Sequence, residues 1–432
     1  MWFKSARPVA LVASVLAYGA VNKSLLQHTN LTDEKENIET PLSIEAKKAK
    51  AREAIQRQMV IAGIPGLSVG VSVNGQTVWR EGFGFANIES GSRCTGDSIM
   101  RIASISKPIT AAIAARLVQE GKLDLDKSIQ TYLPEFPNKK FDGKSVEITT
   151  RQLLSHTGGI RHYRKNSTDN KKDNSKKDFE DPSNRDSDSK EFLSNERFTT
   201  VTEALKLFKD DDLVAKPGTE FRYTTYGFTL VSAVLEKASG MKFKKLLEDL
   251  TSRLEMNHTV LDVNECIIPH RTNYYKRNGA HVLENCPEVN NSNKWAGGGI
   301  LSNVMDLLTF ANTILYSYQA DPTSSRKAFL KKEIVQQLWK GVISVNSKTL
   351  AGLGWMCTDY IDFDGSHKNS GGVWYHTGGA VGASSVLFIH PTTNTSFSER
   401  NAPSGVCVVM LCNLQDTSLL NLAKEVEKIF RK

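Results

Sequence analysis

Hydrophobic and polar residues alternate near the start of the chain in two patterns that predict a helix and a β-hairpin. Residues 44–61 interleave charged side chains with Ala, Ile and Met, which is typical of an amphipathic helix. Residues 66–73 then alternate strictly, a turn follows at Asn74-Gly75, and residues 76–80 form the return strand. The pattern therefore predicts a helix followed by a pair of antiparallel strands.

The middle of the chain is predicted to be mostly helical. One helix begins at Ser104, runs to about Glu120 and ends at Gly121, a residue suited to the left-handed conformation that closes a helix. Apolar periodicity predicts three more helices, at residues 226–238, 242–254 and 305–317.

The chain returns to strands at its end. Residues 381–390 and 405–411 are strand-like, and residues 417–430 form an amphipathic helix. This order predicts an α+β fold of the α/β sandwich type. An antiparallel sheet built from both chain ends is flanked by helices, and a mostly helical subdomain is inserted between them.

Two stretches depart from globular composition. Residues 22–42 are polar and are interpreted as a linker, so we expect the folded domain to span 43–432. From about residue 161 to 197, Lys, Asp, Asn and Ser dominate. Such a segment buries too little apolar area to offset its ordering entropy, which predicts a disordered surface insertion.

Residues 1–42 contain a targeting segment. Lys4 and Arg7 precede an apolar run over residues 8–21, and no acidic residue appears before Asp33. The run is short for a membrane span, which needs about 20 residues. A secretory signal and a mitochondrial presequence with a hydrophobic sorting segment both fit this pattern. Glycosylation would mark the secretory route, at Asn166, Asn257, Asn290 or Asn394.

Charge and cysteine content exclude some classes of protein. The 432 residues carry a net charge of +8, but the basic residues are interleaved with acidic ones. This predicts a solvated basic surface and no nucleic-acid partner. The six cysteines are widely spaced without a C-x-x-C pair, so no zinc site is expected. A disulfide between Cys266 and Cys286 remains an open alternative.

The strongest candidate chemistry lies at the predicted helix start. Ser104 and Lys107 are three residues apart, so they share a helix face and the amine can reach the hydroxyl. A serine needs such a base to become a nucleophile, and a helix N-terminus favours developing negative charge. This S-x-x-K arrangement can carry acyl transfer, although the pattern also recurs by chance. The competing hydroxyl of Ser106 has no lysine three residues later.

Other motifs accompany this pair. Tyr223 stands two residues before Thr225, ahead of an apolar helix, and His-Thr-Gly-Gly at residues 376–379 lies between predicted strands. The glycine run at 297–299 allows close backbone approach and is interpreted as tight packing beside the site. A second His-Thr-Gly, at residues 156–158, follows a helix and is interpreted as a structural turn.

Together these motifs resemble the class C β-lactamase and penicillin-binding-protein superfamily, whose serine hydrolases carry S-x-x-K, Y-x-N and K-T-G-like motifs. The resemblance covers the chain from about residue 44 to its end. It is greatest to the mitochondrial, serine β-lactamase-like members of animals, which have an insertion at the same place. The similar stretches are residues 101–108, 152–160, 295–299 and 376–385.

The resemblance implies a role for each matching residue. Ser104 is the expected nucleophile that forms an acyl-enzyme, and Lys107 holds or accepts its proton. Tyr223 passes that proton to the leaving group. The backbone N–H groups of Ser104 and Gly379 form the expected oxyanion hole. No metal or cofactor is implied.

The chain departs from the family at two positions. Thr225 replaces the Asn of the second motif, and His376 replaces the Lys of the third. His376 and Thr377 are expected to line the far side of the substrate, but a histidine is mostly neutral near pH 7. We therefore expect poor β-lactam hydrolysis. Packing of Tyr223 or His376 in the core remains an alternative to a role in the site.

The sequence thus predicts a serine hydrolase acting on peptide or amide bonds. The resemblance also implies a mitochondrial, membrane-facing location, a link to lipid metabolism and self-assembly into oligomers or filaments. Alternatives are an esterase on small or lipid esters, a scaffold with little turnover, and, for the location, secretion.

Overall fold

Most of the chain after the predicted linker has a defined fold. The computed structural model describes residues 42–164, 190–321, 325–358, 372–392 and 401–431. The predicted targeting segment, the interior of the predicted insertion and the sequons at Asn166 and Asn394 lie outside the described residues.

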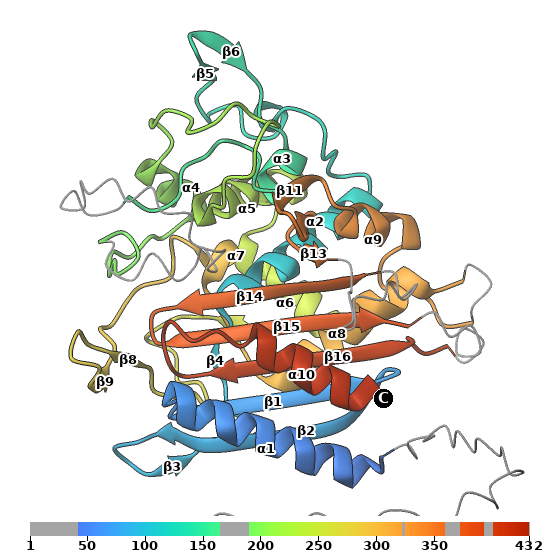
Figure 1. Cartoon of the computed structure of the whole chain (residues 1–432). Coiled ribbons are helices and arrows are strands. Elements are labelled where there is room, and N and C mark those ends of the chain that lie inside the picture. The colour runs from blue at the N-terminus through green and yellow to red at the C-terminus, as the bar shows by residue number, and fades with distance from the viewer. Residues whose placement is uncertain (1–41, 165–189, 322–324, 359–371, 393–400, 432) are drawn as a thin grey trace, which may run out of the picture. The chain divides into compact units, whose positions relative to one another are not determined.

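Strands from both ends of the chain pair in one large antiparallel sheet (Figure 1). Among the described residues it holds nine strands in the order β11-β12-β13-β14-β15-β16-β1-β2-β3. The predicted α+β class and sheet are therefore confirmed. The strands are β1 (Gly66–Val73), β2 (Gln76–Asn87), β3 (Ser92–Arg93), β11 (Ile343–Asn346), β12 (Thr349–Ala351), β13 (Met356–Thr358), β14 (Val373–Ala380), β15 (Ala383–Pro391) and β16 (Gly405–Cys412).

The centre of the sheet joins the first strand to the last. β1 pairs with β16 from Leu67 opposite Cys412 to Val73 opposite Val406. β2 continues well beyond the predicted return strand at residues 76–80. Gly82 lies in the missed part, where an added side chain would meet the backbone of Thr95. Close backbone packing therefore extends the strand through a glycine that gives no strand signal.

Helices cover both faces of the sheet (Figure 1). On one face, α1 (Ile44–Ala62) and α10 (Leu420–Arg431) pack together. On the other face, α8 (Val304–Gln319) packs on β1 and β16. These helices agree with the predicted ones to within a few residues at each end.

A mostly helical region lies beside the sheet, as the sequence predicts. Its main helices are α2 (Ser106–Gln119), α3 (Thr150–Leu154), α4 (Val201–Ala204), α5 (Thr225–Ser239), α6 (Phe243–Arg253), α7 (Trp295–Gly298) and α9 (Lys332–Trp339). Short 3-10 turns are η1 (Ala103–Ile105), η2 (Ile129–Thr131) and η4 (Leu205–Leu207). Small sheets pair β4 (Met100–Arg101) and β7 (Val260–Leu261) with β10 (Ile300–Ser302), β5 (Lys139–Phe141) with β6 (Lys144–Val146), and β8 (Tyr275–Arg277) with β9 (Leu283–Asn285).

The helix predicted to begin at Ser104 begins two residues later. Ser104 lies in η1, because Ala103 adopts a left-handed φ of 49° that breaks the helix on its N-terminal side. Such a conformation is costly for a residue with a side chain, and neighbouring structure must hold it. The amide of Ile102 donates to the carbonyl of Ile300 on β10, at 3.1 Å, which anchors this turn.

The predicted disordered segment at 161–197 is too wide at both ends. Tyr163 and Phe192 are buried, with 8% and 6% exposed surface. Arg161 forms ion pairs with Glu191 and Asp211, so the two flanks are tied to each other. These buried and ion-paired residues are few, so the average composition of the segment does not reveal them.

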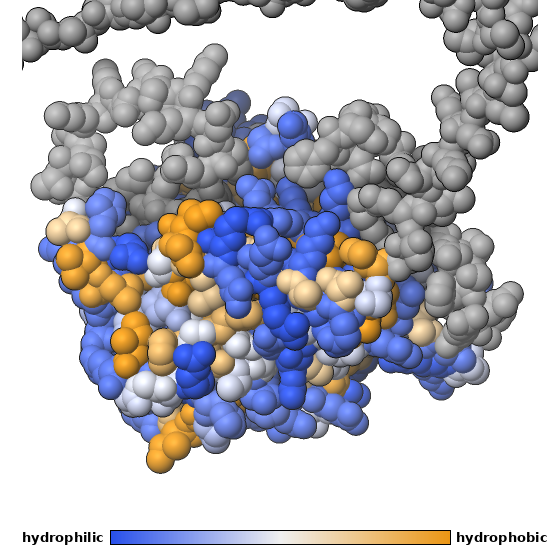
Figure 2. Space-filling model, turned by 60° about the horizontal axis from the view of Figure 1, so that its bottom comes forward, coloured by the Kyte–Doolittle hydropathy of each residue, from blue (hydrophilic) through white to orange (hydrophobic). Residues whose placement is uncertain are grey.

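The surface and the cysteines complete the description. The face turned forward in Figure 2 carries several separate hydrophobic patches among hydrophilic residues. Among the helices of the described ranges, none is long and apolar enough to cross a membrane. Cys266 and Cys286 are both free thiols, so the Cys266–Cys286 disulfide does not form in this structure. Within the same ranges, no group of three or more His, Cys, Asp or Glu side chains is placed to hold a metal ion.

Candidate active site

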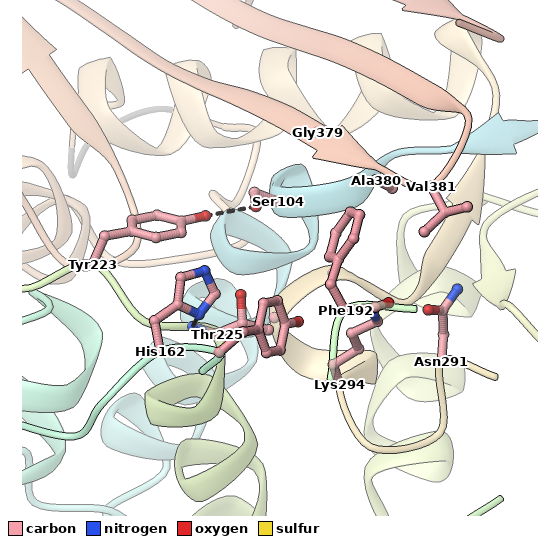
Figure 3. Close-up of a pocket in the computed structure, with 13 residues that line it drawn as sticks. Ser104, His162, Phe192, Tyr223, Thr225, Asn291, Lys294, Gly379, Ala380 and Val381 are labelled. Carbon is pink, nitrogen blue, oxygen red and sulfur yellow. Dashed lines mark hydrogen bonds between the residues drawn. The ribbon is translucent and has the colours of Figure 1, made fainter. Parts of the chain in front are cut away.

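Three side chains from the predicted motifs meet around one hydroxyl group. The Ser104 Oγ lies 3.0 Å from the Lys107 Nζ and 2.6 Å from the Tyr223 Oη. Figure 3 shows the Tyr223 hydroxyl pointing at Ser104 from the left. Both contacts are hydrogen bonds, so a proton can pass between the three groups without movement of the side chains.

Lys107 is fully buried beneath this site. Its Nζ also donates to the carbonyl of Gly297 at 2.6 Å, and it lies 4.7 Å from the ring centre of Tyr223. Gly297 is packed so closely that an added Cβ would lie 2.7 Å from the Thr225 Cγ2. The glycine run therefore lets a backbone carbonyl approach the lysine, and no side chain fits there.

Tyr223 is positioned by the start of α5. The next residue, Thr224, caps this helix by accepting from the Gly227 amide at 3.1 Å, and its hydroxyl donates to the carbonyl of Arg161 at 2.7 Å. These bonds fix the backbone immediately after Tyr223. The hydroxyl of Tyr223 is thereby held over the nucleophile turn.

His156 packs beneath the Tyr223 ring, with ring centres 4.5 Å apart. Its Nδ1 accepts from the Thr224 amide at 3.2 Å. Burial above all, and then the charges of Lys107 and His376, hold the pKa of His156 well below its usual value. His156 is therefore neutral near pH 7. It does lie in a turn, with a φ of 59°, but that turn supports the candidate site.

His162 is a second neighbour of Tyr223 that the sequence analysis did not single out. Its Nδ1 accepts from the Thr225 amide at 3.2 Å, and its ring meets Tyr223 edge-on at 5.5 Å. His162 also lines the pocket beside Ser104. It lies in the stretch interpreted as the beginning of the disordered insertion, which concealed it.

The end of β14 lies against η1, the turn that holds Ser104. β13 pairs with this strand only at Val373–Tyr375, which leaves the following residues next to η1. A Cβ on Gly378 would lie 2.6 Å from the Ile102 carbonyl and would also meet the Ser385 Oγ. The Ser385 hydroxyl itself donates to that carbonyl at 2.8 Å. Gly379 consequently lines the pocket together with Ser104.

Two residues of the third motif, His376 and Thr377, lie on β14. His376 is 3% exposed, and its Nδ1 lies 2.6 Å from the Thr377 carbonyl oxygen. Thr225 lines the pocket around Ser104. The expected contact of His376 and Thr377 with the far side of the substrate stays a prediction, as does the alternative in which His376 packs in the core.

The remaining pocket wall comes from residues without a recognised motif. Lys294 is buried, its Nζ donates to the Phe192 carbonyl at 3.2 Å, and it lies over the rings of Tyr163 and Phe192. Figure 3 places Lys294 and Asn291 on the side opposite Tyr223. Beyond the residues already named, the lining includes Gly298, Ala380 and Val381.

The fold and these motifs define a class of protein. Residues 51–427 match the beta-lactamase family, so the chain belongs to that family of serine hydrolases. More particularly, it is 36% identical over 433 residues to the human mitochondrial serine beta-lactamase-like protein LACTB, covering 88% of this chain and 79% of that protein. The mouse LACTB protein is 35% identical over 439 residues, covering 88% and 80%. These relatives are mitochondrial proteins, in agreement with the expected location.

Solved structures with the same fold are more distant in sequence. A class C beta-lactamase is 18% identical with a TM-score of 0.64, covering 89% of this chain and 96% of that one. The hydrolase EstCE1 is 18% identical with a TM-score of 0.70, covering 90% and 99%. An octameric penicillin-binding protein homologue from Pyrococcus abyssi is 21% identical with a TM-score of 0.68, covering 89% and 77%. At these identities the likeness concerns the fold alone.

Proposed function

We propose that this protein cleaves peptide or amide bonds through an acyl-enzyme formed on Ser104. The observation that carries the proposal is the hydrogen-bonded contact of the Ser104 Oγ with both the Lys107 Nζ and the Tyr223 Oη. A serine between a lysine and a tyrosine has one group to take its proton and another to pass a proton on.

Each step follows from this arrangement. Lys107 accepts the proton of Ser104 as the Oγ attacks the carbonyl carbon. The N–H groups of Ser104 and Gly379 stabilise the developing oxyanion. Tyr223 delivers a proton to the leaving nitrogen as the C–N bond breaks, and the proton held by Lys107 then returns to Tyr223. Water attacks the ester carbonyl carbon and gives up a proton to this pair. The bond to the Ser104 Oγ breaks, the acid leaves, and the pair returns the proton to the Oγ.

Two features of the pocket also lead us to expect poor hydrolysis of β-lactams. Thr225 lines it in place of an amide, and buried His376 does not supply a lysine cation at the pocket wall. A β-lactam carboxylate therefore lacks the fixed charge that it would meet at a K-T-G motif.

A fluorophosphonate probe tests the proposal, because it reacts covalently with an activated serine. Labelling is expected in the full chain and is expected to disappear in Ser104→Ala. Ser106→Ala is the matched control, since the Ser106 hydroxyl is buried and donates to the Ala103 carbonyl at 2.7 Å. No labelling of the wild type at any pH would contradict the proposal and favour a scaffold with little turnover.

The role of Lys107 has its own test. Lys107→Ala is expected to slow acylation by a hundredfold or more, on the order expected for general base catalysis, while substrate binding changes little. Equal losses in acylation and binding would argue against Lys107 as the base. Paired ester and amide substrates with the same acyl group separate a peptidase from an esterase.

The cellular setting is part of the same proposal. The mitochondrial LACTB relatives support action in mitochondria, with the N-terminal segment directing the chain there and associating it with a membrane. The octameric state of the archaeal homologue supports self-association of this protein. We propose that this self-association extends to filaments. The link to lipid metabolism rests on the family resemblance, and lipid analysis of cells lacking the active Ser104 tests it.

A further inference from the structure

A buried charge network lies directly behind the candidate site. Arg101 ends β4 three residues before the nucleophile and is 5% exposed. Its Nε donates to the Asp262 Oδ2 at 2.8 Å, and its Nη1 donates to the Val381 carbonyl, also at 2.8 Å. One planar guanidinium thus joins a carboxylate to the backbone of the turn between β14 and β15.

The carboxylate of Asp262 is shared by three donors. Besides Arg101, it accepts from Arg271 and from the Asn291 Nδ2, at 2.5 Å for the amide. Its side chain is fully buried. Burial alone would lower the pKa of Arg101, but Asp262 raises it above its ordinary value, so the guanidinium stays charged.

The network reaches the pocket wall at two residues. Val381 and Asn291 are lining residues, and Val381 follows Gly379 by two positions. Figure 3 shows Gly379, Ala380 and Val381 in a row beside Ser104, with Asn291 facing Val381. Arg101 is the member that reaches the strand with the oxyanion donor, and its backbone continues through Ile102 and Ala103 into the nucleophile turn.

We propose that Arg101 is a positioning residue that fixes the strand of Gly379 relative to Ser104 through its paired bonds to Asp262 and the Val381 carbonyl. The inference rests on the proposed acyl-enzyme function and deepens it. The oxyanion hole takes one donor from η1 and the other from β14, and these segments belong to different parts of the chain. A small displacement between them separates the two donors.

The expected size of the effect follows from that geometry. A displacement of about 1 Å at a catalytic group costs on the order of a hundredfold in rate, and a lost oxyanion donor costs a similar factor. The pocket is also lined by Tyr163, Phe192 and Lys294, whose positions do not rest on the Arg101 fork, so we expect substrate binding to change little. Loss of the Arg101 fork is therefore expected to lower kcat by about a hundredfold and to change KM by less than about threefold.

Arg101→Lys and Arg271→Lys form a matched pair of variants in the full chain. Both keep a positive charge beside Asp262, but a lysine lacks the planar fork that makes two fixed bonds. Arg271 donates to Asp262 and to the Val263 carbonyl, whereas Arg101 donates to Asp262 and to the Val381 carbonyl. Arg101→Lys is expected to lower activity, whereas Arg271→Lys is expected to leave it near the wild-type level.

Three measurements separate positioning from simple destabilisation. They are kcat and KM for p-nitrophenyl butyrate, the inhibition constant of phenylboronic acid, and the melting temperature. A boronate bound to Ser104 mimics the tetrahedral intermediate, so its affinity is expected to fall in Arg101→Lys by the same factor as kcat/KM. A purely structural role would lower the melting temperature and leave the kcat of the folded fraction unchanged.

Each outcome decides between a positioning role and a purely structural role of Arg101. Equal kcat losses in both lysine variants, or unchanged boronate affinity in Arg101→Lys, would overturn the positioning role. If Arg101→Lys does not fold, Asp262→Asn is tested by the same measurements. Failure of both to fold would show that the network serves the fold and would also overturn it. If the wild type does not label at Ser104, the proposed function itself fails, and the inference fails with it.

Discussion

At the scale of single residues, the candidate site depends on what surrounds the reacting atoms. Ser104 and Lys107 are brought together by three residues of local chain, whereas Tyr223 arrives from a distant segment. His156 and His162 then hold the Tyr223 ring and the start of α5. The tyrosine is therefore held at the nucleophile by packing and backbone hydrogen bonds.

Removal of the Tyr223 hydroxyl tests its role in proton transfer. Tyr223→Phe keeps the ring over His156, so we expect the fold and KM to be nearly unchanged while kcat falls by about a hundredfold or more. Steady-state kinetics on an amide substrate measure this. Tyr226→Phe is the control, because Tyr226 is buried on α5 but does not line the pocket. Similar losses in both variants would assign Tyr223 to packing.

The neutral state of His156 predicts a pH dependence of stability. Its pKa is depressed in the folded protein, so below about pH 6.5 the unfolded chain binds a proton that the folded chain does not. The free energy of unfolding is therefore expected to fall with decreasing pH, by about 1.4 kcal/mol per pH unit from this group. The loss continues until the pH reaches the lower folded pKa.

His156→Asn removes this dependence while keeping an oxygen acceptor for the Thr224 amide, and asparagine tolerates the left-handed φ. Urea unfolding between pH 7 and pH 5 measures the difference from the wild type. His281→Asn is matched to it, since His281 has the same φ of 59° but is exposed. An equal pH slope in wild type and His156→Asn would contradict the assignment of a neutral, buried His156.

At the scale of elements, the site is a contact between a turn and a strand. η1 holds Ser104, and β14 packs against it because glycine at 378 leaves no side chain in the way. The 3-10 geometry of η1 and the short pairing of β13 are as important here as the regular helices. Both open the edge of β14 toward the nucleophile.

Gly378→Ala tests this contact. The new methyl group would crowd the Ile102 carbonyl and the Ser385 hydroxyl, so β14 is expected to move away from η1. Overpacking of this kind costs about 1–3 kcal/mol of stability, but loss of the oxyanion donor costs about a hundredfold to a thousandfold in rate. Chemical denaturation and steady-state kinetics measure the two effects. Gly279→Ala is the control, because no atom lies within 4 Å of an added Cβ there.

Local sequence signals predict the regular elements and the S-x-x-K pair, because hydrophobic period, turn residues and helix caps act over a few residues. These local signals do not predict η1, because the left-handed conformation of Ala103 results from packing against β10 and β15. They also do not predict that His162, Lys294 or Arg101 belongs to the site. Those residues join the site only when distant segments meet.

At the scale of the whole molecule, the first and last elements of the described fold are in direct contact. α1 packs on α10, and β1 pairs with β16. On α10, buried Glu427 contacts the His390 Nδ1 of β15 at 2.7 Å and the Arg431 Nε at 2.9 Å. β15, which pairs with the strand of Gly379, is thus fastened to the last helix, so we expect the candidate site to depend on closure of the full domain.

The cysteines give a prediction about the whole fold. Because Cys266 and Cys286 do not form a disulfide, dithiothreitol is expected to leave the melting temperature unchanged. A native disulfide would instead contribute about 2–4 kcal/mol, and its reduction would lower that temperature by several degrees. Exposed Cys266 is expected to react first with a thiol reagent. Burial raises the pKa of Cys286 and of Cys407 to about 12, so these thiols react slowly.

Thiol titration before and after unfolding checks this order. One fast-reacting group is expected in the folded protein, and it is expected to disappear in Cys266→Ser, while the other thiols become reactive on unfolding. A dithiothreitol-sensitive melting temperature, together with loss of that sensitivity in Cys266→Ser, would restore the Cys266–Cys286 disulfide. The domain would then be held by a covalent link. Without it, stability rests on the two hydrophobic cores on either side of the large sheet.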